Sequence, residues 1–262
     1  MASIQDLISL SGKTTIITGS ASGIGRAIAE RFAEAGSNLI LVDIDKKNLE
    51  KTRVDLERYN VEVSAHYCDL SEKGEIDAIW KDIAKQCPNI LVNNAGIYPF
   101  KDFLDIEQEF YQKVQDINLN SMVWMCQKFI RTGINRGGSI INISSIEAIL
   151  PFKEHLAHYT ISKAGVIALT RALARDYGKK GFRVNTIIPG GIITSGTKNV
   201  AKQVLKLDFS LVKTGYDFMS RLPLSRMGQP DEVARIALVL ASELSSYITG
   251  ALIPVDGGFL ST

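Results

Sequence analysis

Cysteine and histidine are both scarce in this 262-residue sequence, which contains three of each. Cys68, Cys87 and Cys126 are odd in number, widely spaced and not arranged as a CxxC pair. This pattern disfavours both a disulfide framework and a structural zinc site. We therefore expect no metal centre and a reducing, cytoplasmic environment.

Long apolar runs and an excess of one charge are also missing. Nowhere do eighteen apolar residues follow one another, and the start, MASIQDLISLSGK, lacks the basic stretch, apolar run and cleavage site of a leader peptide. The formal net charge is +2 and the basic residues are scattered, so the sequence offers no broad basic field for nucleic acid. We expect a protein that binds neither membranes nor nucleic acids.

What the sequence does contain is a regular alternation of two patterns. Short apolar runs rich in β-branched residues occur at residues 14–18, 38–43, 61–67, 89–94, 139–144, 183–189 and 251–256. Most lack polar alternation, as expected for strands covered on both faces, and the longer stretches between them have helical spacing. This order predicts an α/β fold with a doubly wound parallel sheet in one domain spanning residues 1–262. Residues 195–222 interrupt the alternation.

The segment TGSASGIG directly follows the first predicted strand and opens a predicted helix. Gly19 permits a tight turn, while Gly23 and Gly25 let backbone amides at the helix N-terminus approach a pyrophosphate. The strand before the segment and the helix after it match the setting of a dinucleotide-binding fingerprint. The alternative is a loop that only needs residues with positive φ.

Asp43 ends the second predicted strand, 18 positions after Gly25, about where the fingerprint places an acceptor for a ribose 2′-hydroxyl. A carboxylate accepts that hydrogen bond and repels a 2′-phosphate. The glycine loop also carries Ser22 rather than a basic residue. These features predict NAD(H) rather than NADP(H) as the cofactor. The alternative is that Asp43 only caps the turn before residues 44–48.

Tyr159 and Lys163 are four positions apart in the segment HYTISKAG, so in a helix they share one face. A free tyrosine has a pKa of about 10, which is too high for efficient proton exchange near neutral pH. An ammonium about 4 Å away contributes roughly 4 kcal/mol at an effective dielectric constant of about 20. We therefore expect Lys163 to lower the pKa of Tyr159 and to make it a general acid and base.

These segments belong to a larger set of motifs in a fixed order. After TGSASGIG come NNAG at 93–96, Asn118, ISS at 143–145, YTISK at 159–163 and PGGIIT at 189–194. Together they resemble the short-chain dehydrogenase/reductase family of the classical type, from about Leu10 to the C-terminal ITGALIPVDGG. The resemblance implies a seven-stranded Rossmann fold and a nicotinamide-dependent oxidoreductase that acts on CH–OH groups.

The same resemblance implies a catalytic group of Asn118, Ser145, Tyr159 and Lys163. Ser145 holds the substrate oxygen, Tyr159 exchanges a proton with it, and Lys163 also binds the nicotinamide ribose. Asn118 holds a water that connects the lysine to solvent. No metal is implied.

The family's cofactor contacts fall on Gly19, Ser22, Gly23, Ile24, Gly25, Asp43, Asp69, Leu70, Asn93, Ala95, Gly96, Tyr159, Lys163, Pro189, Gly190, Ile192 and Thr194. Asp69 matches a residue at the adenine end, and Asn93 matches one near the adenosine ribose. Thr194 and the backbone of Ile192 match contacts to the nicotinamide carboxamide. Two alternatives stay open, namely that Asp69 caps the helix starting near Glu72 and that Asn93 only bridges strands.

The sequence departs from the family pattern at two points. Ser145 and Tyr159 are 14 positions apart where the family usually has 13, which leaves Ser144 as a minor rival for Ser145. We interpret this as one extra residue in an exposed loop, IEAILPFKEHLAH. The second departure is Ile188 before Pro189, where the family often has asparagine.

The longer loop brings Glu154, His155 and His158 near the tyrosine in the sequence. We expect His158 to be a solvated loop histidine. The alternative is that it titrates or touches the substrate.

Residues 195–222 fall where the family carries its variable substrate lid. Apolar side chains in this lid and after NNAG are Leu205, Leu207, Phe209, Leu211, Val212, Tyr216, Phe218, Met219, Tyr98, Pro99 and Phe100. They predict an apolar, bulky ketone or secondary alcohol as substrate, because no conspicuous anion-binding cluster accompanies them. The alternative is that they pack on the protein or on a neighbouring subunit.

The helix expected at residues 121–130 is apolar on more than one face, and burial against another subunit explains that surplus. The family resemblance implies a homotetramer built on this helix, the helix after Tyr159 and the last strand. The predicted function is an NAD(H)-dependent carbonyl reductase or alcohol dehydrogenase. The alternatives are a 3-oxoacyl thioester reductase, for which NADPH is the usual cofactor, and an NAD-binding regulator without turnover.

Overall fold

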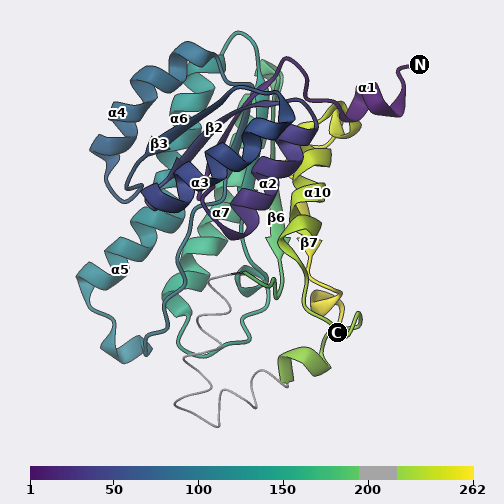
Figure 1. Ribbon diagram of the computed structural model, residues 1–262. Helices are drawn as coiled ribbons and strands as arrows, with labels where there is room; N and C mark the ends of the chain where they lie inside the picture. Colours follow the sequence, from purple (N-terminus) through teal and green to yellow (C-terminus); the bar gives the residue numbers. More distant parts are fainter. Residues whose placement is uncertain (195–216) are drawn as a thin grey trace.

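The computed structural model describes residues 1–194 and 217–262 and contains a seven-stranded parallel sheet (Figure 1). The strands are β1 (Thr14–Thr18), β2 (Asn38–Asp43), β3 (Val63–Tyr67), β4 (Ile90–Asn93), β5 (Gly138–Ile143), β6 (Phe182–Pro189) and β7 (Leu252–Val255). Their order is β3-β2-β1-β4-β5-β6-β7, with all neighbours parallel. The expected doubly wound α/β fold in a single domain is confirmed.

The helices alternate with the strands along the chain. They are α1 (Ile4–Ile8), α2 (Gly23–Glu34), α3 (Lys46–Leu56), α4 (Lys73–Ile83), α5 (Gln108–Gln115), α6 (Ser121–Gly133), α7 (Ala157–Tyr177) and α10 (Pro230–Ala241). A π-helical turn, Asp116–Asn120, joins α5 to α6. Single 3₁₀ turns occur at Glu57–Tyr59, Ala84–Gln86, Phe103–Asp105, Ile146–Ala148, Gly178–Lys180, Glu243–Ser245 and Phe259–Ser261. Among the helices of the described ranges, none is long and apolar enough to cross a membrane.

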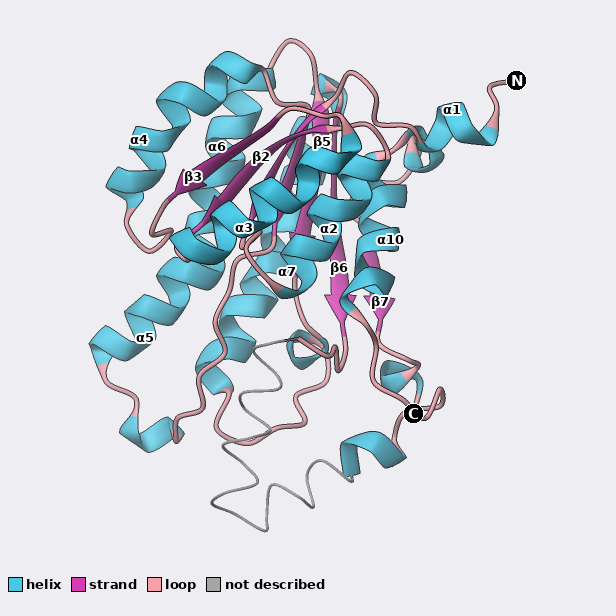
Figure 2. Ribbon diagram, in the orientation of Figure 1, coloured by secondary structure: helices cyan, strands magenta, loops and turns pink. Residues whose placement is uncertain are grey.

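Helices cover both faces of the sheet, as Figure 2 shows. On β1, Ile17 packs in one core cluster with Phe32 of α2 and Val233 of α10. Its neighbour Ile16 packs in the opposite cluster with Trp80 of α4 and Phe129 of α6. Because successive side chains of a strand point to opposite faces, both positions must be apolar. The strand sequences therefore lack polar alternation.

The strand order reverses between β1 and β4, because β2 follows β1 on one side while β4 lies on its other side. At such a switch point the loops diverge and leave a crevice outside the carboxyl ends of the strands. The glycine loop follows β1, the NNAG motif begins at the end of β4, and Ser145 follows β5. The topology thus gathers the predicted site at one edge of the sheet.

Candidate active site

The turn between β1 and α2 requires glycine for two reasons. Gly19 has φ of +65°, which favours glycine, and α2 begins at Gly23, where φ is +54°. A Cβ atom on Gly25 would lie only 2.1 Å from the carbonyl oxygen of Gly19. Positive φ, the alternative explanation of these glycines, therefore accounts for part of the pattern, and close backbone packing accounts for the rest.

Asn94 fixes this turn from the neighbouring strand end. Its side-chain amide donates to the carbonyl oxygens of Thr18 and Gly19, both at 3.0 Å. The Oγ1 of Thr18 accepts hydrogen bonds from the backbone nitrogens of Asn94 and Ala95 at 3.0 and 3.1 Å. Sequence reasoning gave Asn94 no role, although it lies inside the NNAG motif, because only the pairing of β1 with β4 brings it here.

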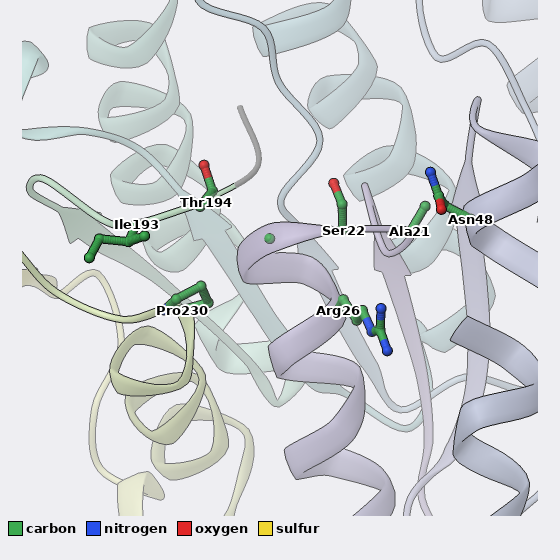
Figure 3. Close-up of a pocket in the computed structure, with 8 residues that line it drawn as sticks. Ala21, Ser22, Arg26, Asn48, Ile193, Thr194 and Pro230 are labelled. Carbon is green, nitrogen blue, oxygen red and sulfur yellow. The ribbon is translucent and has the colours of Figure 1, made fainter. Parts of the chain in front are cut away.

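A pocket of about 360 Å³ lies between the start of α2 and the segment after β6 (Figure 3). Ser22 and Thr194 lie on opposite sides of it, and a Cβ atom on Gly23 would come 3.3 Å from the Thr194 methyl group. The full lining is Ala21, Ser22, Gly23, Arg26, Asn48, Ile193, Thr194 and Pro230. Three residues predicted to contact the cofactor thus face one cavity.

The segment that leaves β6 is anchored to the last strand. The backbone nitrogen of Gly190 donates to the carbonyl oxygen of Val255 at 3.0 Å, directly after Pro189. Ile192 is buried and forms a parallel bridge with Gly228. These contacts hold the chain in position as it reaches Thr194, the last residue described before the gap.

Asp43 lies at the end of β2, beside the glycine loop. One carboxylate oxygen accepts from the backbone nitrogen of Ala21 and the other from that of Asp45, both at 2.9 Å. The turn-capping alternative is therefore part of its role. Each oxygen of a carboxylate accepts more than one hydrogen bond, so acceptor capacity for a ribose hydroxyl remains.

The three residues predicted around the adenosine differ in exposure. Asp69 is partly buried, and its Oδ1 accepts from the backbone nitrogen and the hydroxyl of Ser71 at 2.9 and 2.7 Å, whereas the neighbouring Leu70 is buried. The cap of α4 is instead Glu72. Asp69 therefore shapes the turn before the helix.

Asn93 bridges two neighbouring strands. It is only 1% exposed, and its amide nitrogen donates to Oδ1 of Asn142 on β5 at 2.9 Å and to the sulfur of Cys126 at 3.2 Å. The alternative of a bridge between strands describes this side chain, and its contact with the cofactor stays a prediction.

The structure brings three of the four predicted catalytic residues together at the start of α7. The Lys163 ammonium lies 5.9 Å from the centre of the Tyr159 ring, and the hydroxyl groups of Tyr159 and Ser145 are hydrogen-bonded. Lys163 is 3% exposed and donates to the carbonyl oxygen of Ile143 at 2.9 Å. The phenol, the ammonium and the serine hydroxyl thus lie close together.

Asn118, the fourth member, is fully buried in the π-helical turn. Its Oδ1 accepts from the backbone nitrogen of Ile97 at 2.8 Å, and its amide donates to the Ile97 carbonyl oxygen at 2.9 Å and to the Ser162 hydroxyl at 3.1 Å. A Cβ atom on Gly96 would lie 3.3 Å from both this Oδ1 and the Lys163 nitrogen. Asn118 and Lys163 therefore converge on Gly96, and π-helical turns of this kind are frequent at functional sites.

The pKa of Tyr159 shifts in the direction opposite to the one expected from the sequence, because burial has the larger effect. Burial raises the pKa of Tyr159 to about 12, although the hydrogen bond from Ser145 opposes that change. Burial also lowers the pKa of Lys163 to about 8. Both shifts have one cause, since removal from water disfavours the phenolate as well as the ammonium.

Ser144 and Ser145 take different roles. The Ser144 hydroxyl is buried and donates to the backbone carbonyl oxygen of Lys163 at 2.9 Å. Ser145 is partly exposed and faces Tyr159. The geometry therefore favours Ser145 over Ser144 for the predicted catalytic role, a choice that the sequence left open.

The expectation that His158 is a solvated loop histidine is wrong. His158 is 0% exposed, its Nε2 hydrogen-bonds the carbonyl oxygen of Pro99 at 2.7 Å, and its ring packs edge-on against Phe110 of α5. It lies in the first turn of α7 rather than in the loop, which explains its burial. Glu154 and His155 are exposed as loop residues.

Aromatic and charged side chains border the tyrosine. The Tyr98 ring lies 5.8 Å from the Tyr159 ring and 5.6 Å from the Phe100 ring. Phe218 instead packs against Phe152 and Phe259, each at 5.0 Å, which matches the alternative of packing on the protein. The predicted lid residues Leu205, Leu207, Phe209, Leu211, Val212 and Tyr216 lie outside the described residues, and Met219 is exposed.

Sequence reasoning also missed Glu147, which lies two positions after Ser145 and is 5% exposed. Across the described parts of the chain, no three His, Cys, Asp or Glu side chains group as metal ligands. The structure thus places the glycine turn and its pocket at the same edge of the sheet as a group of buried titratable side chains.

Comparison with known proteins agrees with this description. A family model described as enoyl-(acyl carrier protein) reductase matches residues 19–260. The 3-oxoacyl-[acyl-carrier-protein] reductase FabG of Thermotoga maritima is 34% identical, over 96% of this chain and 99% of its own. The 2-dehydro-3-deoxy-D-gluconate 5-dehydrogenase of Bacillus subtilis is 35% identical, over the full length of both chains.

The solved structures give the same picture. The L-sorbose reductase of Gluconobacter frateurii, in complex with NADPH and L-sorbose, superposes with a TM-score of 0.90. It is 31% identical to this chain, and the match covers 98% of this chain and 99% of the reductase.

Proposed function

The chain belongs to the short-chain dehydrogenase/reductase family, oxidoreductases that act on CH–OH groups, and we propose that it interconverts a secondary alcohol and a ketone with NAD(H). The observation that carries the proposal is the meeting of Ser145, Tyr159 and Lys163 at the edge of the sheet that also holds the glycine loop. A protein that only binds a dinucleotide has no need of this group.

The proposed mechanism assigns one task to each side chain. The nicotinamide, when bound, supplies or accepts the hydride. Ser145 holds the carbonyl oxygen of a ketone, and Tyr159 donates its proton to that oxygen. Lys163 remains mostly protonated at pH 7, because its pKa is about 8, and its ammonium stabilises the phenolate left behind. Asn118 fixes the backbone at Ile97 and so supports the wall next to Lys163.

The proposed cofactor is NAD(H). Support comes from the Asp43 carboxylate beside the glycine loop and from Ser22, a neutral residue in that loop. The basic residue of the same pocket, Arg26, is ion-paired with Asp55 at 2.7 Å. The L-sorbose reductase holds NADPH, so relatives differ in this property. Measuring kcat/KM with NADH and with NADPH tests the proposal, and a preference for NADPH contradicts it.

We also propose that the protein is a cytoplasmic homotetramer built on α6, α7 and β7. The support is the apolar character of α6 on more than one face, with Met122 and Phe129 buried while Val123 and Trp124 are partly exposed. Light scattering at micromolar concentration tests the assembly, and a monomer contradicts it.

A second candidate function is reduction of a 3-oxoacyl thioester. The matched family model and the Thermotoga maritima relative favour it. Asp43 argues against it, because Asp43 favours NAD(H) whereas such reductases usually use NADPH.

The test is a spectrophotometric screen of ketones and alcohols with NADH and NAD, next to acetoacetyl-CoA with NADPH. Tyr159→Phe serves as the matched variant, and we expect it to lose about 100- to 10,000-fold in kcat while keeping its affinity for NADH. Full turnover by Tyr159→Phe contradicts the assignment of the proton donor. Turnover with acetoacetyl-CoA and NADPH alone supports the second candidate.

A further inference from the structure

His158 is a buried side chain that the mechanism above does not use. It lies in the first turn of α7, directly before Tyr159, and is 0% exposed. Its Nε2 lies 2.7 Å from the carbonyl oxygen of Pro99 and donates to it, because a carbonyl oxygen only accepts. The other ring nitrogen, Nδ1, is buried without a hydrogen-bond partner among the described residues. A buried polar atom without a partner lowers stability, so packing alone does not explain a histidine here.

Helix α5 holds this histidine in place. The Phe110 ring meets the imidazole edge-on, with the ring centres 4.9 Å apart. The side-chain amide of Gln115 donates to the backbone carbonyl oxygen of His158 at 3.0 Å. Because both the ring and the backbone of His158 are held, its Nε2 is a fixed anchor point for Pro99.

The segment anchored by His158 carries the aromatic side chains beside Tyr159. Pro99 lies between Tyr98 and Phe100, whose rings are 5.6 Å apart. The Tyr98 ring lies 5.8 Å from the Tyr159 ring. The hydrogen bond to Pro99 therefore ties the residue before the proposed proton donor to the residue after Tyr98.

Tyr98 lies between two fixed points of the backbone. On one side, Asn118 bonds both the backbone nitrogen and the carbonyl oxygen of Ile97. On the other side, His158 bonds the carbonyl oxygen of Pro99. Proline has no backbone N–H, so this carbonyl oxygen is the one backbone group through which a hydrogen bond can hold Pro99. Loss of the His158 bond therefore frees one of the two points that fix Tyr98.

We infer that His158 is a positioning residue for substrate specificity, because its hydrogen bond to Pro99 fixes the Tyr98 ring as an apolar face beside Tyr159 for one substituent of the substrate. The inference deepens the proposed oxidoreductase function and rests on it. A ring that is already ordered binds a substituent more favourably than a ring that the substrate must first order. His158 therefore acts on a substituent that reaches Tyr98, and not on the reacting carbon.

The experiment compares two ketones that differ by an aryl group, 4-phenyl-2-butanone and 2-butanone, and measures kcat and KM with NADH. We expect the wild-type protein to favour the aryl ketone. In His158→Asn the side chain is too short to place a donor at the Nε2 position. The KM for the aryl ketone should then rise about three- to tenfold, while kcat, the KM for 2-butanone and the affinity for NADH stay unchanged. His158→Phe keeps a ring against Phe110 without a donor and serves if the asparagine variant fails to fold.

Two further variants separate positioning from a structural role. His158→Gln places an amide nitrogen near the position of Nε2, so it should restore the low KM for the aryl ketone. In Tyr98→Ala the contact with the aryl group is already lost, so adding His158→Asn should raise that KM no further. His66→Asn is the control, because His66 is a partly buried histidine on the edge strand β3, and it should leave both KM values unchanged.

An equal rise of both KM values in His158→Asn means a structural role and overturns the inference alone. The same holds if His158→Gln fails to restore the KM, if the full effect persists in Tyr98→Ala, or if the wild-type protein does not favour the aryl ketone. Absence of turnover across the panel of ketones and alcohols overturns the proposed function, and the inference with it.

Discussion

The two ends of the proposed active site are built from different parts of the polypeptide. The cofactor end depends on backbone, since Gly19 and Gly25 are excluded from carrying a Cβ by contacts with neighbouring main chain. The substrate end depends on side chains, since the polar side chains of Asn118, Lys163 and Glu147 are buried there, each from a different segment of the chain. A backbone site is specified by a short local motif, whereas a side-chain site is specified by how remote segments pack.

The two ends also differ in their effect on the stability of the fold. The glycine turn satisfies its carbonyl groups through Asn94. At the substrate end, Lys163 is buried with a lowered pKa and one oxygen of Glu147 lacks a partner in the described structure. These groups lower the stability of the fold, and active sites commonly keep such groups because function needs them.

The largest expected effect separates two adjacent serines. Ser145→Ala removes a hydroxyl that faces Tyr159, and we expect kcat to fall about 100- to 1,000-fold. Ser144→Ala removes a hydrogen bond to the Lys163 carbonyl oxygen, so we expect a loss of about 1 kcal/mol in the free energy of unfolding and little change in kcat. Steady-state kinetics and urea unfolding measure both, and equal kinetic defects would show that the site does not distinguish the two serines.

Lys163→Met tests the cost of the buried ammonium. In the folded protein Lys163 loses its proton at a pH of about 8, instead of 10.5. Between these values the unfolded chain binds more protons, so the contribution of Lys163 to stability rises with pH across this window. The free energy of unfolding of the wild type relative to Lys163→Met should therefore increase by up to about 3 kcal/mol from pH 7 to pH 10. Urea unfolding at several pH values measures this, and a difference independent of pH contradicts it.

Gly25→Ala tests the backbone end. The new Cβ would meet the Gly19 carbonyl oxygen at 2.1 Å, so we expect a loss of about 1–3 kcal/mol in stability and weaker NADH binding. Gly74→Ala is the matched control, because that glycine lies in helix α4 with open space around its Cβ position. It should stabilise the protein by about 0.5–1 kcal/mol. Thermal unfolding and NADH titration distinguish the two variants. Unaltered NADH affinity in Gly25→Ala contradicts a close approach of this backbone to the cofactor.

Asp43→Ala gives the smallest expected change, because it removes one side-chain contact at the otherwise backbone-built end. We expect the ratio of kcat/KM for NADH over NADPH to fall about tenfold, equivalent to about 1.4 kcal/mol, as repulsion of a 2′-phosphate disappears. Asp45→Ala is the control, since Asp45 is exposed and caps α3. An unchanged ratio in Asp43→Ala would mean that other residues determine the cofactor preference.

The amino-acid sequence by itself determined the alternation of strands and helices, the two-sided burial of the sheet and the position of the glycine turn. These features follow from residues close together in the chain, through apolar periodicity and the conformational freedom of glycine. Runs such as TTIIT and NLILVD coincide with β1 and β2 because no tertiary contact had to override their pattern. The grouping of Ser145, Tyr159 and Lys163 was likewise expected from the family resemblance, and their roles stay predictions.

Only the tertiary structure decided how the buried polar groups are used. The pairing of β4 with β5 turned Asn93 into a bridge to Asn142, and the packing of α7 on α5 buried His158 against Phe110. The pKa of Tyr159 and the unpaired oxygen of Glu147 depend on which distant segments exclude water from them. No local pattern records that exclusion, because desolvation is a property of the assembled fold.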